Sequence, residues 1–140
     1  MYEITELRLG ENRKTRLWLS AKALGDFKDF RTKGVIEGRF LSKLRWCCNV
    51  GFDMCERGSK PIVTCEWDGV YRIGFQFSLV RIIGFYEDRT KKDFIAIHVR
   101  LKHGQKLTAR DRECINEVGN VRKNRLWRKA ADERYPRLAQ

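Results

Sequence analysis

The sequence has little of what marks membrane, exported or linker-joined proteins. Two prolines occur in 140 residues, and no segment approaches the ~20 consecutive apolar residues that a membrane-spanning helix needs. The first residues, Met-Tyr-Glu-Ile-Thr-Glu, lack the basic and then apolar stretch of an export signal. No Gly/Ser-rich linker or internal repeat divides the chain. We therefore expect one cytoplasmic domain that does not bind a membrane.

Motifs for metals, cofactors and common nucleophiles are also absent. The five cysteines are an odd number and include no Cys-x-x-Cys pair, so we expect reduced thiols and no metal site. The sequence contains no Gly-x-Ser-x-Gly, no Gly-x-x-x-x-Gly-Lys-Ser/Thr, no Gly-x-Gly-x-x-Gly and no zinc-protease histidine pair. Serine hydrolysis and nucleotide-cofactor chemistry are therefore disfavoured, and we expect no cofactor.

Positive charge is what the sequence has in excess. Thirty Lys and Arg residues against eighteen Asp and Glu residues give a formal net charge of +12. A charge of this sign and size attracts polyanions, and nucleic acid is the expected partner. Residues 1–120 are expected to form a single domain. Residues 121–140 are expected to form a basic extension that is helical or flexible.

Apolar spacing in the first half predicts one strand and a helical hairpin. Residues 2–9 alternate weakly, in the manner of a short strand. From Arg16 to Phe30, apolar residues recur at three- and four-residue steps, and a second such stripe follows Gly34 and stops near Gly51. Two amphipathic helices in succession are typical of a helical hairpin.

The second half predicts an antiparallel β-meander. Residues 69–103 are rich in aromatic and β-branched residues at two-residue spacing, which is the period of a strand. We expect three or four strands in this segment, the last over residues 94–101.

A C-terminal helix follows the meander. Thr108 and Asp111 form a capping-box pattern for a helix from Ala109 to about Val118, which Gly119 ends. The predicted fold class is therefore α+β: an N-terminal strand, a helical hairpin, a β-meander and a C-terminal helix. We expect the helices to cover one face of the sheet and to leave the other exposed for function.

Cationic residues interrupt strands that would otherwise be apolar on both sides: Arg72, Arg81, Arg100 and Lys102. Strands hold side chains rigidly, and a guanidinium group matches two oxygens of a phosphodiester. RNA is cleaved when its 2′-hydroxyl is aligned with the adjacent phosphate, the developing charge is neutralised and two protons are managed. The pattern indicates a metal-free ribonuclease. The alternative is that these residues form the solvated side of an ordinary sheet.

Two histidines are candidates for proton transfer. His103 ends the last strand and begins the loop His103-Gly104-Gln105-Lys106, which precedes a helix N-terminus and suits a phosphate. His98 lies in the middle of the strand, where a structural role competes with proton transfer or RNA contact. Three aromatic residues either stack on bases or belong to the core: Trp46, Trp67 and Tyr86.

Three segments in order carry a family pattern. Residues 70–72 read Val-Tyr-Arg, residues 80–85 read Val-Arg-Ile-Ile-Gly-Phe, and residues 94–106 read Phe-Ile-Ala-Ile-His-Val-Arg-Leu-Lys-His-Gly-Gln-Lys. Ahead of an amphipathic helix, they resemble the RelE/ParE superfamily of bacterial toxins, most of all its HigB-like, phage-derived branch. The sequence departs from that branch at four positions, which are Val70 for glutamate, Arg100 for phenylalanine, His103 for lysine and Thr108 for proline.

The resemblance implies a toxin that cleaves mRNA on the ribosome and that a cognate antitoxin holds inactive. The arginines would stabilise charge, the lysines would position the phosphate, and Gln105 would contact backbone or base. We infer that His103 transfers the proton, with His98 as the alternative. The candidate catalytic residues are Arg72, Arg81, Lys102 and His103. The candidate RNA-binding residues are His98, Arg100, Gln105 and Lys106.

Two non-enzymatic interpretations stay open. The first is a non-catalytic binder, either a ParE-like inhibitor of DNA gyrase or a phage-derived nucleic-acid-binding module. The second is a basic phage structural or packaging protein. An enzyme needs Arg72, Arg81 and a proton-transfer group within reach of a single phosphate, whereas a binder needs only a diffuse basic surface.

Overall fold

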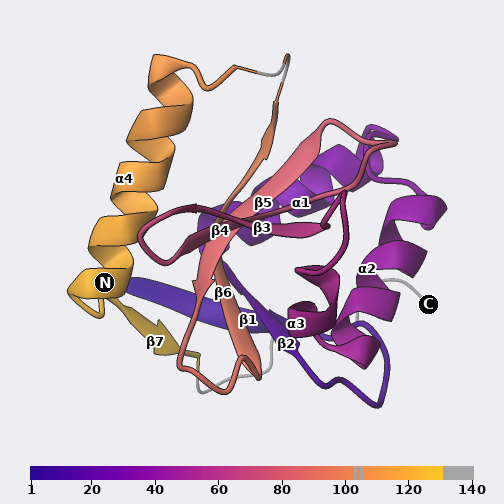
Figure 1. The fold of residues 1–140 in the computed structure, drawn as a ribbon, viewed down its shortest axis with the longest axis horizontal. Helices are drawn as coiled ribbons and strands as arrows, with labels where there is room; N and C mark the ends of the chain where they lie inside the picture. Colours follow the sequence, from indigo (N-terminus) through magenta and orange to yellow (C-terminus); the bar gives the residue numbers. More distant parts are fainter. Residues whose placement is uncertain (103, 105, 131–140) are drawn as a thin grey trace.

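A computed structural model describes residues 1–102, 104 and 106–130 of the protein. Within this part of the chain, four helices flank one seven-stranded mixed sheet of order β3-β4-β5-β6-β2-β1-β7 (Figure 1). In chain order the elements are β1 (Tyr2–Leu7), β2 (Arg16–Ser20), α1 (Ala21–Thr32), α2 (Gly38–Val50), α3 (Phe52–Cys55), β3 (Val63–Trp67), β4 (Val70–Gly74), β5 (Val80–Tyr86), β6 (Asp93–Leu101), α4 (Ala109–Lys123) and β7 (Trp127–Lys129). None of the helices in the described ranges is long and apolar enough to cross a membrane.

The antiparallel meander predicted from the alternating pattern is confirmed. β4 pairs with β5 and β5 with β6, and β3 is added as an edge strand antiparallel to β4. A bulge between Ile83 and Gly84 interrupts the pairing of β5 with β6. A Cβ atom on Gly84 would lie 2.0 Å from the carbonyl oxygen of Ile95. The two backbones therefore approach closely here because residue 84 has no side chain.

The helix predicted from Arg16 begins instead at Ala21, because the five residues before it form β2. Leu17 and Leu19 are both fully buried, as alternate residues of a strand are. β2 pairs with β1 on one side and runs parallel to β6 on the other. Ser20 then caps α1 by accepting a backbone hydrogen bond. Over five residues, the apolar spacing of a helix and that of a strand cannot be told apart in the sequence. The pairing with β1 and β6 determines that this segment is a strand.

The predicted pair of helices is α1 and α2. α2 begins at Gly38 and not directly after Gly34, whose backbone φ of +75° lies in the left-handed region and turns the chain between the helices. α2 ends at Val50, as the position of Gly51 predicts. The N-terminal strand ends at Leu7, two residues earlier than predicted.

Helices cover both faces of the sheet, so the expectation of one exposed face is wrong. One buried cluster, which includes Phe27 and Phe40, lies between the sheet and the helices α1, α2 and α3. A second cluster joins Phe85 of the sheet to Ile115 and Val118 of α4. Figure 1 shows α4 on the opposite side of the sheet from α1 and α2. The apolar stripe of α4 needs a partner, and the second sheet face supplies it.

The chain beyond residue 118 also differs from expectation. α4 continues through Gly119 to Lys123, since the helix packs its buried side on the sheet and Gly119 fits against it. The capping box at its start is present as predicted. Residues 121–123 thus complete α4, and Trp127–Lys129 pairs in parallel with β1 as a strand of the sheet. Residues 131–140 lie outside the described residues.

Candidate nucleic-acid interface

Arg72, Arg81 and Arg100 lie on three adjacent strands and on the same face of the sheet. Arg81 is in register with Arg100 on one side and with Gly74 on the other. Arg72 precedes Gly74 by two residues, so all three side chains leave the sheet on the side of α4. Together with Lys102 they line a cavity of about 20 Å³ at the N-terminal end of α4. The structure therefore brings four of the predicted site residues together.

The three arginines have different charge partners. The guanidinium of Arg72 lies 3.0 Å from a carboxylate oxygen of Glu66. That of Arg100 lies 3.0 Å from Asp111. Arg81 instead donates hydrogen bonds to the carbonyl oxygens of residues 78 and 80, at 2.6 and 2.9 Å. No carboxylate of the described residues lies within ion-pairing distance of Arg81.

Arg81 is the electrostatically unsatisfied member of the group. Its side chain is half-buried, and this desolvation, followed by repulsion from Arg72, lowers the pKa of its guanidinium group below the ordinary value. Glu66 opposes the shift but is itself paired with Arg72. An anion bound between Arg72 and Arg81 would relieve both effects. The cavity of about 20 Å³ has room for only about one water molecule, so a phosphate group that pairs with both arginines would lie in the larger hollow that they also line.

His98 lies on the same strand as Arg100, but its ring contacts a carboxylate of α4. Its Nε2 atom lies 2.6 Å from a carboxylate oxygen of Glu117, and the hydroxyl of Tyr2 donates to the other oxygen of the same carboxylate. His98 lines a separate hollow of about 580 Å³ beside α1 and α4, and not the cavity of Arg72 and Arg81. The structure thus does not bring His98 to the arginines that would hold a phosphate.

The loop before α4 is described only in part. Lys102 lines the arginine cavity, whereas Lys106 is exposed and lines neither hollow. His103 and Gln105 lie outside the described residues. In the described chain, no group of three or more His, Cys, Asp or Glu residues is arranged to hold a metal ion.

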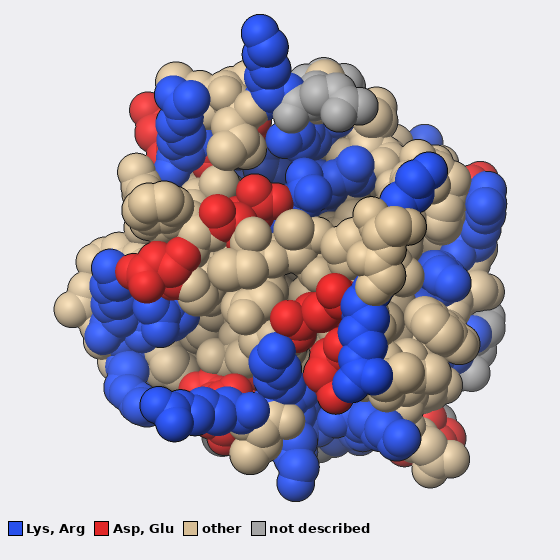
Figure 2. Space-filling view, in the orientation of Figure 1, with Lys and Arg blue, Asp and Glu red and all other residues tan. Residues whose placement is uncertain are grey.

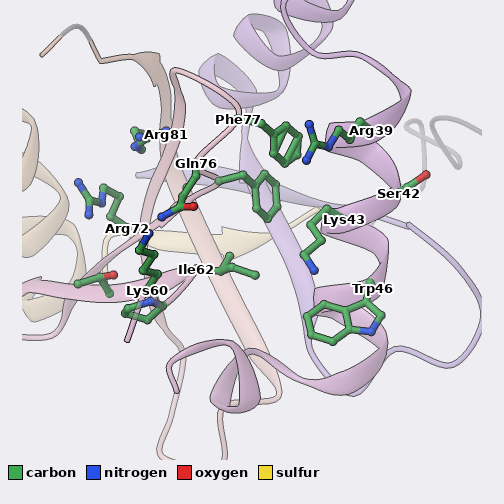
Figure 3. Close-up of a pocket in the computed structure, with 14 residues that line it drawn as sticks. Arg39, Ser42, Lys43, Trp46, Lys60, Ile62, Arg72, Gln76, Phe77 and Arg81 are labelled. Atoms are coloured by element: carbon green, nitrogen blue, oxygen red, sulfur yellow. The ribbon is translucent and has the colours of Figure 1, made fainter. Parts of the chain in front are cut away.

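A larger hollow opens beside the arginine cavity, with a volume of about 1210 Å³. Arg72 and Arg81 line both cavities, and Figure 3 shows them on one wall of the larger hollow. The far wall of the hollow is α2, which contributes Ser42 and three larger residues that share one helix face: Arg39, Lys43 and Trp46. This wall was not among the predicted site residues, although Lys43 and Trp46 lie off the apolar stripe of α2, which indicates that they face solvent.

Positive charge is spread over the surface of the molecule (Figure 2). Figure 2 shows Lys and Arg side chains spread across one face of the molecule, with a few acidic side chains between them. The three aromatic residues predicted either to stack on bases or to belong to the core differ in exposure. Trp46 and Trp67 are 46% and 70% exposed. Tyr86 is partly buried and donates a hydrogen bond to Glu56. Tyr86 therefore has a structural role, and its hydroxyl is held by Glu56.

Comparison of the chain with family models, with curated proteins and with solved structures found no match.

Proposed function

We propose that this protein is a metal-free endoribonuclease of the RelE/HigB toxin type, which cleaves mRNA on the ribosome and is inhibited by an antitoxin. One observation carries the proposal: Arg81 is half-buried, has no carboxylate partner among the described residues and stands beside Arg72. Two guanidinium groups held on neighbouring strands can neutralise the extra negative charge that develops on a phosphate during cleavage.

The element order supports the proposal. The N-terminal strand β1, the helices α1 and α2, the meander of β4, β5 and β6, and the C-terminal helix α4 occur in this order along the chain. This is the order that the resemblance to RelE-like toxins implies. Four further elements are added to this order: β2 between β1 and α1, α3 and β3 between α2 and β4, and β7 after α4. In the sheet, β2 lies between β6 and β1.

The proposed reaction needs no group besides side chains. The 2′-oxygen attacks the adjacent phosphorus, the bond to the 5′-oxygen breaks, and the products are a 2′,3′-cyclic phosphate and a 5′-hydroxyl. One proton leaves the 2′-hydroxyl and one reaches the leaving 5′-oxygen. Lys102, which lines the arginine cavity, would position the phosphate. His103, the next residue, is the proposed proton-transfer group. Glu117 holds the ring of His98, which makes His98 the weaker candidate.

A non-catalytic nucleic-acid binder is the second candidate. Glu66 and Asp111 pair with Arg72 and Arg100, so two of the three arginines are already neutralised within the chain. A binder tolerates such pairs because it needs only the remaining positive surface.

Primer extension on a translated message distinguishes the two candidates. We expect the wild-type protein to cut the message, and Arg81→Ala to reduce cleavage by about 10²–10³-fold, with an unchanged unfolding midpoint. Arg89→Ala removes the same charge from an exposed turn and serves as the matched control, with full activity expected. Cleavage at the wild-type level by Arg81→Ala would overturn the site assignment. A wild-type protein that binds the message without cutting it would favour the binder.

A further inference from the structure

Three residues on one face of α2 differ from the rest of that helix. Arg39, Lys43 and Trp46 follow one another at four- and three-residue steps, which places them on the same side of the helix. The apolar residues of α2 point the other way, into the core, with Phe40 and Leu44 almost fully buried. The three residues, here called the α2 platform, are therefore not needed to fill the core.

The α2 platform combines cations with aromatic surface. The Nζ atom of Lys43 lies 4.2 Å from the ring centroid of Trp46, and the guanidinium carbon of Arg39 lies 4.0 Å from that of Phe77. Figure 3 shows these pairs on the wall of the hollow opposite Arg72 and Arg81. Among the described residues, no carboxylate forms an ion pair with Arg39 or Lys43. Trp46 is 46% exposed, so part of its ring is open to a ligand.

We infer that the α2 platform binds an unpaired base and its phosphate in single-stranded RNA, next to the linkage held by Arg72 and Arg81. This inference rests on the proposed function, because it extends the same substrate from Arg72 and Arg81 across the hollow that they line. Aromatic rings flanked by cations bind single strands, since every unpaired base has a face that can stack and every nucleotide has a charge. A duplex hides those faces. An acidic peptide would match the charges but would leave the indole unused.

The size of the hollow agrees with an extended ligand. Its volume of about 1210 Å³ exceeds the ~300–1,000 Å³ of a typical small-molecule pocket. Arg72 and Arg81 line the same hollow as Trp46 and Lys43. A strand whose scissile phosphate lies at the arginines thus has room for neighbouring nucleotides that reach α2.

Binding is measured with a strand that cannot be cut. The probe is a fluorescein-labelled 2′-O-methyl oligouridylate of about twelve nucleotides, which lacks the attacking hydroxyl, and the readout is fluorescence anisotropy with the full chain. We expect Trp46→Ala to weaken binding about 5- to 100-fold and Trp46→Phe to restore much of the loss, because phenylalanine still stacks. Lys43→Ala should lower the salt dependence of log Kd by about 0.7. Met54→Ala removes a large exposed apolar side chain outside the hollow and should change nothing.

The outcomes separate this inference from the proposed function. If the wild-type protein binds the probe through Trp46 but cuts no message, the platform stands and the ribonuclease proposal fails. If the message is cut while Trp46→Ala and Lys43→Ala bind the probe like the wild type, the inference is overturned. It is equally overturned if Trp46→Ala weakens binding of polyglutamate as much as that of the probe, because an acidic peptide would then be the better occupant.

Discussion

The side chain of Arg81 crosses Gly74 on the neighbouring strand, so that a Cβ atom at position 74 would lie 2.6 Å from the Cδ atom of Arg81. The two residues are paired in register between β4 and β5. The missing side chain at position 74 leaves the space through which the guanidinium reaches the carbonyl oxygens of Ser78 and Val80. Gly74 therefore sets the place of the one arginine of the three that lacks a carboxylate partner among the described residues.

Replacement of Gly74 tests whether cleavage depends on the position of the Arg81 guanidinium. Gly74→Ala should displace the guanidinium of Arg81 and reduce message cleavage by about 10–100-fold. Because a flexible side chain yields, the free energy of unfolding should fall by less than about 1 kcal/mol. The control is Gly25→Ala in α1, where no atom lies within 4 Å of the added carbon. It should keep full activity and gain about 0.5–1 kcal/mol of stability. Unaltered cleavage by Gly74→Ala would contradict the role given to Arg81.

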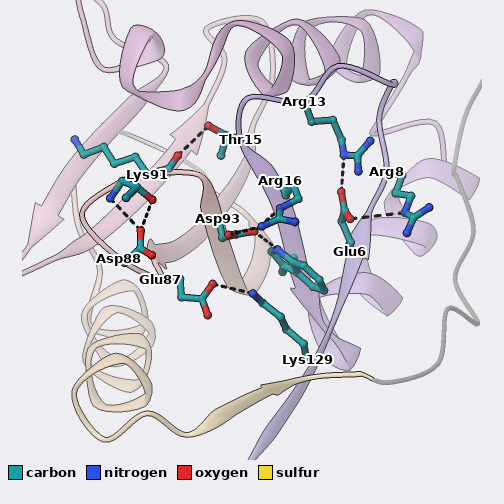
Figure 4. A network of polar contacts seen from close by, with 12 residues as sticks. Glu6, Arg8, Arg13, Thr15, Arg16, Glu87, Asp88, Lys91, Asp93 and Lys129 are labelled. Carbon is teal, nitrogen blue, oxygen red and sulfur yellow. Dashed lines mark hydrogen bonds and ion pairs between the residues drawn. The ribbon is translucent and has the colours of Figure 1, made fainter.

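A buried carboxylate joins β2 to β6. Asp93 is 7% exposed and accepts hydrogen bonds from Arg16 at 2.8 and 2.9 Å and from the indole of Trp18 at 2.8 Å (Figure 4). Arg16→Ala leaves this carboxylate without its cation, and we expect a loss of about 1–3 kcal/mol in urea unfolding. Adding Asp93→Asn should recover part of the loss, because a neutral amide costs less to bury than an unpaired charge.

The exposed pair of Lys22 and Asp26 is the control for that experiment. Their nitrogen and oxygen lie 3.0 Å apart on the surface of α1, and Lys22→Ala should lower the free energy of unfolding by less than about 0.5 kcal/mol.

The double variant of Arg16→Ala and Asp93→Asn also offers a contrary outcome. If its loss in the free energy of unfolding equals the losses of the two single variants added together, Arg16 and Asp93 are not coupled.

The contact between Tyr2 and Glu117 predicts a pH dependence at alkaline pH. The hydrogen bond to the carboxylate, followed by desolvation, raises the pKa of Tyr2 from 10.0 to about 12. A pKa raised in the folded state means that this contact stabilises the fold fully below pH 10 and ceases to do so as the pH rises towards 12. Glu117→Gln should therefore shift the tyrosinate absorbance of Tyr2 to lower pH.

The variant Tyr2→Phe assigns the tyrosinate absorbance change to Tyr2. The part of the absorbance curve that Glu117→Gln shifts should be missing from the curve of Tyr2→Phe. Burial by itself would raise the pKa of Glu117, but the hydrogen bonds from Tyr2 and His98 outweigh it and hold the pKa below the usual value. Loss of these bonds in the unfolded chain means that Glu117 stabilises the fold above its ordinary pKa and not in acid. Identical tyrosinate curves for the wild type and Glu117→Gln would rule out the contact.

Local pattern predicted those elements whose signal lies within a few residues. The alternation in residues 69–103 predicted the meander, and Thr108 with Asp111 predicted the start of α4. The pattern failed where a short segment fits two structures: Leu17 suits the helix stripe and the strand equally. β7 has three residues, and its pairing with β1 depends on a contact between the two ends of the described chain that no local spacing encodes.

The sequence by itself determined the excess of positive charge, the cations placed on the meander strands and the aromatic residue off the apolar stripe of α2. Only the tertiary structure decided which of these cations is left without a carboxylate. Strand register and the packing of α4 bring three carboxylates within a few ångströms of their partners: Glu66 to Arg72, Asp111 to Arg100 and Glu117 to His98. Ion pairing falls off with distance and depends on burial, and both are set by contacts between residues far apart in the chain.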